Sequence, residues 1–280
     1  GVPYGGDVWD FYAGKAKAEE SLPLGVILTI PAAGSESSPS SVITNEDGWL
    51  KRGYTANVMR PKFALLNPEL TFSLPPYQTA CGVADMMAHI MERYFTNQTD
   101  VGFSDHLCEA ALRGIIQYAP LAVREPENYE ARANIMWAGT IAHNDLLGMG
   151  REQDWASHDI EHELSALYDI AHGAGLAIVF PAWMKYVYKH NPNRFVQFAV
   201  RVFGVDQDFY NPERTILEGI RRLEEFFRSI GLPTRLQDAE IPADRLEEMA
   251  AKATKNDTHK LGGFLPLGQK DVLAIYELCR

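Results

Sequence analysis

The chain has 280 residues, 46% of them hydrophobic, and a formal net charge of −11. Its length is sufficient for one large or two modest domains with a sizeable core. The acidic balance and the lack of any basic run argue against a nucleic-acid-binding surface and against attraction to an anionic membrane.

Three cysteines lie far apart in the chain and form no C-x-x-C motif. They therefore predict neither a disulfide framework nor a thiolate zinc site, and they fit a reducing compartment such as the cytoplasm. The longest apolar stretch, residues 174–187, contains Pro181 and Lys185 and is too short to span a membrane.

The first seventy residues predict short strands joined by turns. Residues 24–30 (LGVILTI) form a continuous apolar run, which is typical of a strand buried on both faces, and a small-residue turn follows it. Residues 41–44 and 53–58 flank the turn sequence Asn-Glu-Asp-Gly and predict a hairpin. Residues 62–66 predict one more short strand, closed by an Asn-Pro pair.

Helical periodicity replaces the strand pattern after the double proline at residues 75 and 76. Asn-Pro at residues 211 and 212 marks a helix start, and Gly231 marks a helix end. The pattern predicts a small strand-rich part followed by a larger all-helical domain, with a boundary near residue 72. The expected helices cover residues 77–96, 103–122, 127–147, 155–167, 173–190, 193–203, 212–230, 242–255 and 269–279.

Two pairs of potential metal ligands lie on these predicted helices. Asp85 and His89 are four residues apart, as are His158 and His162, so each pair shares one helix face. His172 follows in an Ala-His-Gly turn directly before an apolar helix. A carboxylate combined with imidazoles suits a divalent first-row metal. Either pair alone would more often be solvated or part of the core, but the two pairs together with His172 favour a metal site.

Four longer segments carry a resemblance to a known family. They are TIPAAGSES (29–37), LPPYQTACGVADMMAHIMERYFT (74–96), PENYEARANIMWAG (126–139) and QDWASHDIEHELSALYDIAHGAGLAIVFPAW (153–183). The chain resembles, from end to end, the iron-containing (group III) alcohol dehydrogenase superfamily, and within it the butanol dehydrogenase and NADPH-dependent aldehyde reductase branch. The resemblance implies a metal-dependent oxidoreductase that interconverts primary alcohols and aldehydes, such as butanol and butanal, with NAD or NADP.

The resemblance also implies roles for the candidate ligands. The family's metal ligands fall on Asp85, His89, His158 and His172, and the ion is Fe²⁺ or Zn²⁺, because such a ligand set accepts either. His162 matches a family histidine that lies beside the nicotinamide without binding metal and that can relay the alcohol proton. His143 belongs to a segment that faces the substrate cleft in the family, and we expect it to pack or to line the pocket.

The cofactor residues implied by the resemblance lie before residue 55. A family Thr-Gly-Ser-Glu turn corresponds to residues 33–36, so Gly34 and Ser35 are expected to contact the cofactor, although Ala33 lacks the threonine hydroxyl. Lys51 matches a family lysine that reaches the cofactor, and Ser40 falls near the same surface. Without the resemblance, Lys51 would be interpreted as a solvated hairpin lysine. The residues that separate NAD from NADP do not stand out in this chain.

Family members begin with about 100 further residues, one ordinary domain's worth, which include a glycine-rich phosphate loop. We therefore expect a mainly α protein in which residues 1–72 are the remnant of a Rossmann-like α/β cofactor domain and residues 73–280 form the helical metal-binding domain. Weak nicotinamide binding and a homo-oligomer, such as a dimer, are expected consequences. The alternatives are a helical metal-binding module without catalysis and a sister enzyme similar to glycerol dehydrogenase or dehydroquinate synthase.

Overall fold

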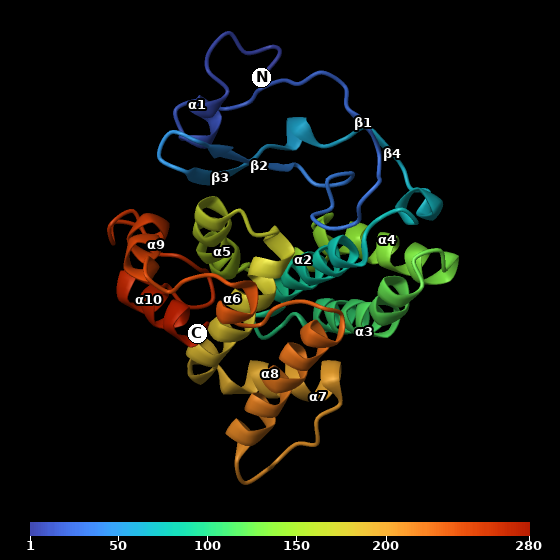
Figure 1. Cartoon of the computed structure of the whole chain (residues 1–280), viewed down its shortest axis with the longest axis vertical. Coiled ribbons are helices and arrows are strands. Elements are labelled where there is room, and N and C mark those ends of the chain that lie inside the picture. Colours follow the sequence, from blue (N-terminus) through green and yellow to red (C-terminus); the bar gives the residue numbers. More distant parts are fainter.

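Strands occur only before residue 66 in the computed structural model, which describes all 280 residues. Every later element is a helix, so the mainly α architecture expected from the periodicity is confirmed. Figure 1 shows the strands and the short helix α1 (Trp9–Tyr12) as a thin cap over one end of the helical body.

The strands form two separate two-stranded sheets. β1 (Gly25–Ile27) pairs in parallel with β4 (Phe63–Leu65), and β2 (Ser40–Asn45) pairs antiparallel with β3 (Leu50–Thr55). The hairpin prediction is confirmed, but its second strand begins at Leu50 instead of residue 53. The intervening turn closes early because Gly48 and Trp49 both adopt left-handed backbone conformations, with φ of 84° and 51°.

The prediction that residues 24–30 form a strand buried on both faces is wrong. β1 is only three residues long, and the exposed fraction is 49% for Leu24 and 59% for Ile27. β4 is its single strand neighbour, so the apolar run is not enclosed in a wide parallel sheet. Only Leu28 of this run is buried.

Each helix expected after residue 75 is present. Two of them are shorter than predicted: α4 stops at His143 because Asp145 adopts a left-handed φ of 73°, and α9 begins at Leu246 instead of residue 242. The helices are α2 (Pro76–Tyr94), α3 (Gly102–Arg124), α4 (Tyr129–His143), α5 (Ala156–Tyr168), α6 (His172–Val187), α7 (Pro192–Phe203), α8 (Pro212–Ser229), α9 (Leu246–Ala253) and α10 (Gln269–Leu278).

The helix α2 is the centre of the core. It packs against α3, α4 and α6, and all its residues from Thr79 to Tyr94 are buried. Gly82 lets the loop after β1 lie directly on this helix, because a Cβ at that position would lie 2.2 Å from the Pro31 carbonyl oxygen. Polar side chains on α2 therefore need partners inside the protein. None of the helices has the length and apolar character needed to cross a membrane.

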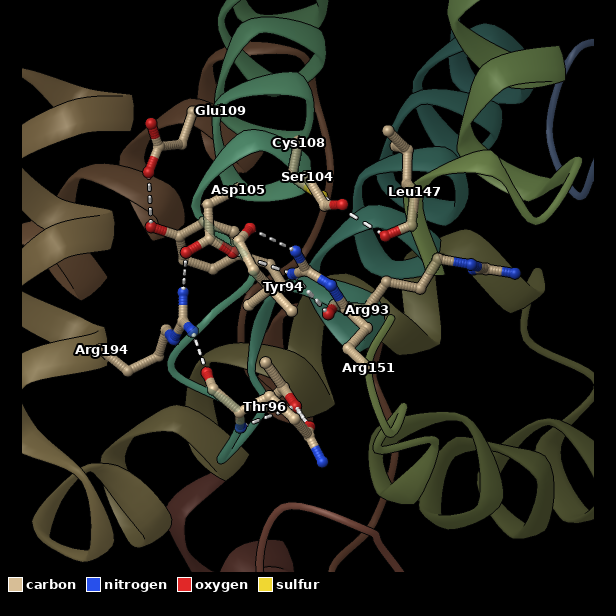
Figure 2. Close-up of polar contacts among 12 residues, drawn as sticks. Arg93, Tyr94, Thr96, Ser104, Asp105, Cys108, Glu109, Leu147, Arg151 and Arg194 are labelled. Carbon is tan, nitrogen blue, oxygen red and sulfur yellow. Dashed lines mark hydrogen bonds and ion pairs between the residues drawn. The ribbon is translucent and has the colours of Figure 1, made fainter. Parts of the chain in front are cut away.

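A network of buried charges encloses the C-terminal end of α2 (Figure 2). Asp105 on α3 contacts Arg194 at 2.5 Å through one carboxylate oxygen and Arg151 at 2.9 Å through the other. The Tyr94 hydroxyl donates to Glu109 at 3.0 Å, and Arg151 also donates to the Arg93 carbonyl oxygen at 3.1 Å. These charge-assisted contacts tie α2, α3 and α7 together with the loop before α5.

Candidate metal centre

Three helices bring potential ligands to one buried point. Asp85 lies on α2, His158 lies on α5, and His172 is the first residue of α6. Asp85 Oδ1 lies 3.9 Å from His158 Nε2 and 3.8 Å from His172 Nε2, and the three ligand atoms are all within 4.8 Å of one another. Two ligand atoms that each lie about 2.0–2.2 Å from one ion are separated by no more than twice that distance, and the separations of 3.8 and 3.9 Å satisfy this limit. The structure therefore brings three of the expected ligands together.

His89 lies beside this group without joining it. Its Nδ1 is 2.9 Å from the Asp85 carbonyl oxygen and 3.2 Å from Asp85 Oδ1, and its ring centroid is 4.6 Å from that of His158. Neither ring nitrogen is within 4.8 Å of all three other ligand atoms. The hydrogen bond from Nδ1 to a backbone carbonyl leaves Nε2 unprotonated, which is the form in which a histidine binds metal.

Two of the converging atoms are buried and have no hydrogen-bond partner. These atoms are Asp85 Oδ1 and His158 Nε2. An unsatisfied buried polar atom costs about 1–3 kcal/mol, more if it is charged, so native proteins rarely leave two facing each other. A carboxylate oxygen and an imidazole lone pair are both good donors to a divalent cation. The residues present thus fit a metal ion.

Buried carboxylates orient the two imidazoles that face Asp85. His158 Nδ1 donates to Glu92 at 3.0 Å, and His172 Nδ1 donates to Glu161. Both oxygens of Glu92 also accept backbone N–H groups, from Trp155 at 2.9 Å and from His158 at 3.2 Å, so Glu92 is an acceptor and the His158 ring presents its Nε2 lone pair to Asp85. Against the effect of burial, Glu161 raises the pKa of His172 and holds the proton of that ring on Nδ1. Neither glutamate was predicted as a site residue from the sequence. Glu92 stands seven residues after Asp85, two turns along the same face of α2, and this spacing was the available signal.

Burial sets the protonation of the site. It lowers the pKa of His89, His158 and His162 well below the ordinary value, so these imidazoles are neutral and able to bind a metal or accept a proton. Burial raises the pKa of Asp85 to about 6, with His172 opposing this rise and the Glu161 carboxylate adding to it. A cation beside Asp85 would lower that pKa again, because it favours the ionised form.

The remaining histidines fall into two groups. His162 is 9% exposed, and one of its ring nitrogens lies within 4.8 Å of ligand atoms of Glu161 and His172, at the edge of the Asp85 group. His143 is 8% exposed and packs against His89 with ring centroids 4.2 Å apart. The other three are exposed surface residues: His106, His190 and His259.

The expected cofactor residues are spread over the N-terminal cap. Gly34 has a left-handed φ of 63° and is buried against α4, where a Cβ would lie 2.7 Å from His143 Cβ, whereas Ser35 is exposed. Ser40 is exposed at the start of β2, with its hydroxyl 2.8 Å from that of Thr55. Lys51 is not a freely solvated hairpin lysine, because its Nζ donates to Ser165 Oγ at 2.7 Å and lies 3.9 Å from Glu161.

A cavity of about 430 Å³ opens onto the site. Asp85 and His172 line it, and the rest of its wall comes from the loop after β1, from the start of α2 and from the turn before α6. A larger cavity of about 550 Å³ lies between α1, β3 and α9 and contains none of the candidate metal ligands. A small molecule in the smaller cavity would therefore lie against Asp85 and His172.

Comparisons with known proteins agree along the whole chain. Residues 79–279 match the model of the C-terminal part of the Fe-containing alcohol dehydrogenase family, and residues 2–68 match the iron-containing alcohol dehydrogenase model. The probable NADH-dependent butanol dehydrogenase 1 of Bacillus subtilis is 44% identical over 275 residues, which are 98% of this chain and 70% of that protein. The NADPH-dependent aldehyde reductase YqhD of Escherichia coli is 35% identical, with the same two coverages.

A solved structure gives the same result. The crystal structure of NADH-dependent butanol dehydrogenase A from Thermotoga maritima superimposes on this chain with a TM-score of 0.94 and 40% sequence identity. The superposition covers 99% of this chain and 71% of that structure. The chain thus spans about 70% of the length of the relatives that it matches.

Proposed function

The chain belongs to the iron-containing alcohol dehydrogenase family, in its butanol dehydrogenase and aldehyde reductase branch, and we propose that one carboxylate and three imidazoles hold its divalent ion. These four ligands are Asp85, His89, His158 and His172. The protein is an oxidoreductase that interconverts alcohols and aldehydes with a nicotinamide cofactor. The observation that carries the ligand assignment is the buried pair Asp85 Oδ1 and His158 Nε2, which face each other without any partner.

When bound, the ion would polarise the substrate oxygen, and the nicotinamide would supply or accept the hydride. The protein's own residues position and support these groups. Asp85 offsets part of the ionic charge, while Glu92 and Glu161 keep the rings of His158 and His172 in the required tautomer. Burial of the ligands excludes water, which strengthens every electrostatic interaction in the site.

We propose His162 as the residue that exchanges the proton of the alcohol. It is neutral because burial lowers its pKa, and it lies next to Glu161 and His172 at the edge of the ligand group. A neutral imidazole at this place can accept the hydroxyl proton during oxidation and return it during reduction. Since four other residues suffice to hold the ion, His162 remains free for this role.

The substrate and the cofactor contacts are proposed in more detail. We propose short primary alcohols and aldehydes, such as butanol and butanal, because relatives carry the names butanol dehydrogenase and aldehyde reductase and the cavity above Asp85 is small. Cofactor contacts are proposed for Gly34, Ser35, Ser40 and Lys51. Replacing Lys51 with Ala should then raise the dissociation constant of NADH or NADPH, measured by fluorescence titration.

We also propose a division into residues 1–72 and 73–280, which is supported by the separate matches at 2–68 and 79–279. A homodimer is proposed from the exposed apolar side chains of β1 and β4, among them Ile27 at 59% and Phe63 at 63%. A reducing compartment, the cytoplasm, is proposed because all three cysteines are buried and free.

A metal-dependent assay tests the function directly. Protein stripped of metal with a chelator is reloaded anaerobically with Fe²⁺ or Zn²⁺, and NADH and NADPH oxidation is followed with butanal as substrate. Metal content is measured in parallel for the wild type, for Asp85→Asn and for the control Asp100→Asn, whose carboxylate is exposed. We expect about one ion per chain and restored turnover in the wild type and the control, but not in Asp85→Asn. Equal turnover with and without metal would refute the proposal.

A further inference from the structure

His143 differs from the other imidazoles of the site in the partner of its Nδ1 atom. This atom lies 2.8 Å from Nη2 of Arg93, and a guanidinium only donates hydrogen bonds. His143 Nδ1 must therefore accept, and an N–H of this ring can only be on Nε2. His158 and His172 have the opposite arrangement, because their Nδ1 atoms donate to carboxylates.

The protonated nitrogen of His143 has no partner within the protein. No side chain or backbone atom hydrogen-bonds to Nε2, and unlike Asp85 Oδ1 and His158 Nε2 this atom is not sealed from solvent. The ring packs against His89, 4.2 Å away between centroids, and its edge approaches Trp155 at 5.8 Å. A single N–H donor thus remains unused beside His89, a proposed metal ligand.

We propose that His143 donates its Nε2–H to the oxygen of the bound alcohol or aldehyde and that Arg93 is the positioning residue that fixes this tautomer. The proposal rests on the alcohol and aldehyde chemistry assigned above. A polar substrate oxygen that leaves water needs hydrogen-bond partners in the site, and an aldehyde oxygen can only accept. His143 supplies a neutral donor that cannot compete for the metal through Nε2.

Arg93 is held firmly enough to impose the tautomer. Its side chain is 1% exposed, its Nη1 donates to the His89 carbonyl oxygen at 2.7 Å, and its Cζ lies 4.8 Å from the centre of the Trp155 ring. Asp145 Oδ1 lies 3.5 Å from Nη2. Both Trp155 and Asp145 have left-handed backbones, with φ of 68° and 73°. Such strained conformations of non-glycine residues tend to cluster at functional sites.

A purely structural role for His143 would require its side-chain volume but not its N–H group. Its Cβ supports the Gly34 turn, where a Cβ on the glycine would lie 2.7 Å away, and its ring fills space against His89. Packing of this kind needs volume but no N–H group. His143→Leu keeps the volume and removes the donor, whereas His143→Gln places an amide N–H close to the position of the imidazole Nε2. The two variants therefore separate packing from hydrogen bonding.

The test compares these variants as metal-loaded enzymes and also measures the tautomer without metal. We expect His143→Leu to lower kcat/KM for butanal about tenfold, the effect of one lost neutral hydrogen bond, with unchanged metal content and unchanged NADH dissociation constant. His143→Gln should recover most of that loss. In ¹⁵N-histidine NMR spectra of the metal-free protein, His143 should be protonated on Nε2 in the wild type, and Arg93→Gln should abolish this preference.

An unchanged kcat/KM in His143→Leu, or a wild-type His143 protonated on Nδ1, would overturn the proposal. Failure of His143→Gln to exceed His143→Leu would assign the residue to packing alone and overturn it as well. If His143→Leu does not fold, the NMR tautomer and the activity of His143→Gln decide. A wild type that takes up metal yet leaves butanal unreduced would instead refute the proposed function, and the tautomer would still report on Arg93.

Discussion

Two clusters of buried charge lie along α2, and they are built in opposite ways. Asp105 on α3 lies near the C-terminal end of α2. One of its carboxylate oxygens is 2.5 Å from the Arg194 guanidinium and the other is 2.9 Å from the Arg151 guanidinium (Figure 2). Asp85, in the middle of α2, faces imidazole nitrogens at 3.2, 3.8 and 3.9 Å and no guanidinium. Burial lowers the pKa of His89 and His158, which therefore carry no charge.

This difference distinguishes a structural ion cluster from a ligand site. A buried carboxylate between permanent cations is already neutralised, so no further group is required to stabilise it. A buried carboxylate beside the neutral imidazoles of His89 and His158 has lost its hydration without gaining a permanent cation, and a divalent ion would supply that charge. The following predictions test this contrast, in order of expected effect.

The largest effect should come from removing the carboxylate of the structural cluster. Asp105→Ala leaves the buried guanidiniums of Arg151 and Arg194, 0% and 7% exposed, without their counter-ion. We expect the free energy of unfolding to fall by about 3–5 kcal/mol, with or without metal. Urea denaturation measures it, with Asp100→Ala as the exposed control. A loss no larger than that of the control would mean that the network contributes little.

Metal should stabilise the protein only through the Asp85 cluster. At about 1,000 times the dissociation constant of the ion, linkage predicts about 4 kcal/mol of added stability for the wild type. Asp85→Ala should abolish this gain, and its metal-free form should be as stable as the metal-free wild type or more so, because an uncompensated carboxylate is gone. Calorimetry with and without Zn²⁺ provides the measurement. A metal-induced shift that persists in Asp85→Ala would contradict the ligand assignment.

The stability of the metal-free protein should depend on pH, because burial disfavours the ionised carboxylate of Asp85. Burial raises its pKa to about 6 in the folded state, above the unfolded value, so the folded protein binds more protons. The associated stability is present below about pH 4 and is lost as the pH rises through about 6, by roughly 2–3 kcal/mol. Burial also raises the pKa of Asp154 and Asp159, so the comparison is with Asp85→Asn. Parallel pH profiles for the two proteins would show that Asp85 does not contribute.

The smallest effect, a change in metal affinity, is expected from replacing the carboxylate that orients His158. Glu92→Gln should weaken metal binding about tenfold while leaving the fold intact, since the ring is less firmly held in the Nδ1–H tautomer. Competition titration with a chromophoric chelator gives the affinity, and Glu127→Gln serves as the exposed control. An affinity equal to that of the control would show that the tautomer is set by other contacts.

Local patterns in the sequence were sufficient to predict the helices and the hairpin and to choose the candidate ligands. Periodicity placed α2 and α5 because their apolar faces repeat every three to four residues, and the i,i+4 spacings then put Asp85 with His89 and His158 with His162. The burial of residues 24–30 was predicted incorrectly. An apolar run shows that a segment prefers to be covered, but whether other strands and helices cover it depends on the rest of the fold.

Which imidazoles present a lone pair and which an N–H was decided by tertiary structure alone. His143, His158 and His172 are chemically identical in the sequence, and they differ here because an arginine contacts the first and carboxylates contact the other two. Those partners lie 11 to 66 residues away along the chain, beyond the range over which helix or strand periodicity acts. The sequence by itself determined the ligand types and the helices that carry them. Their tautomers, their burial and the partnerless carboxylate follow from how α2, α4, α5 and α6 pack, because each property depends on atoms that only the folded chain brings together.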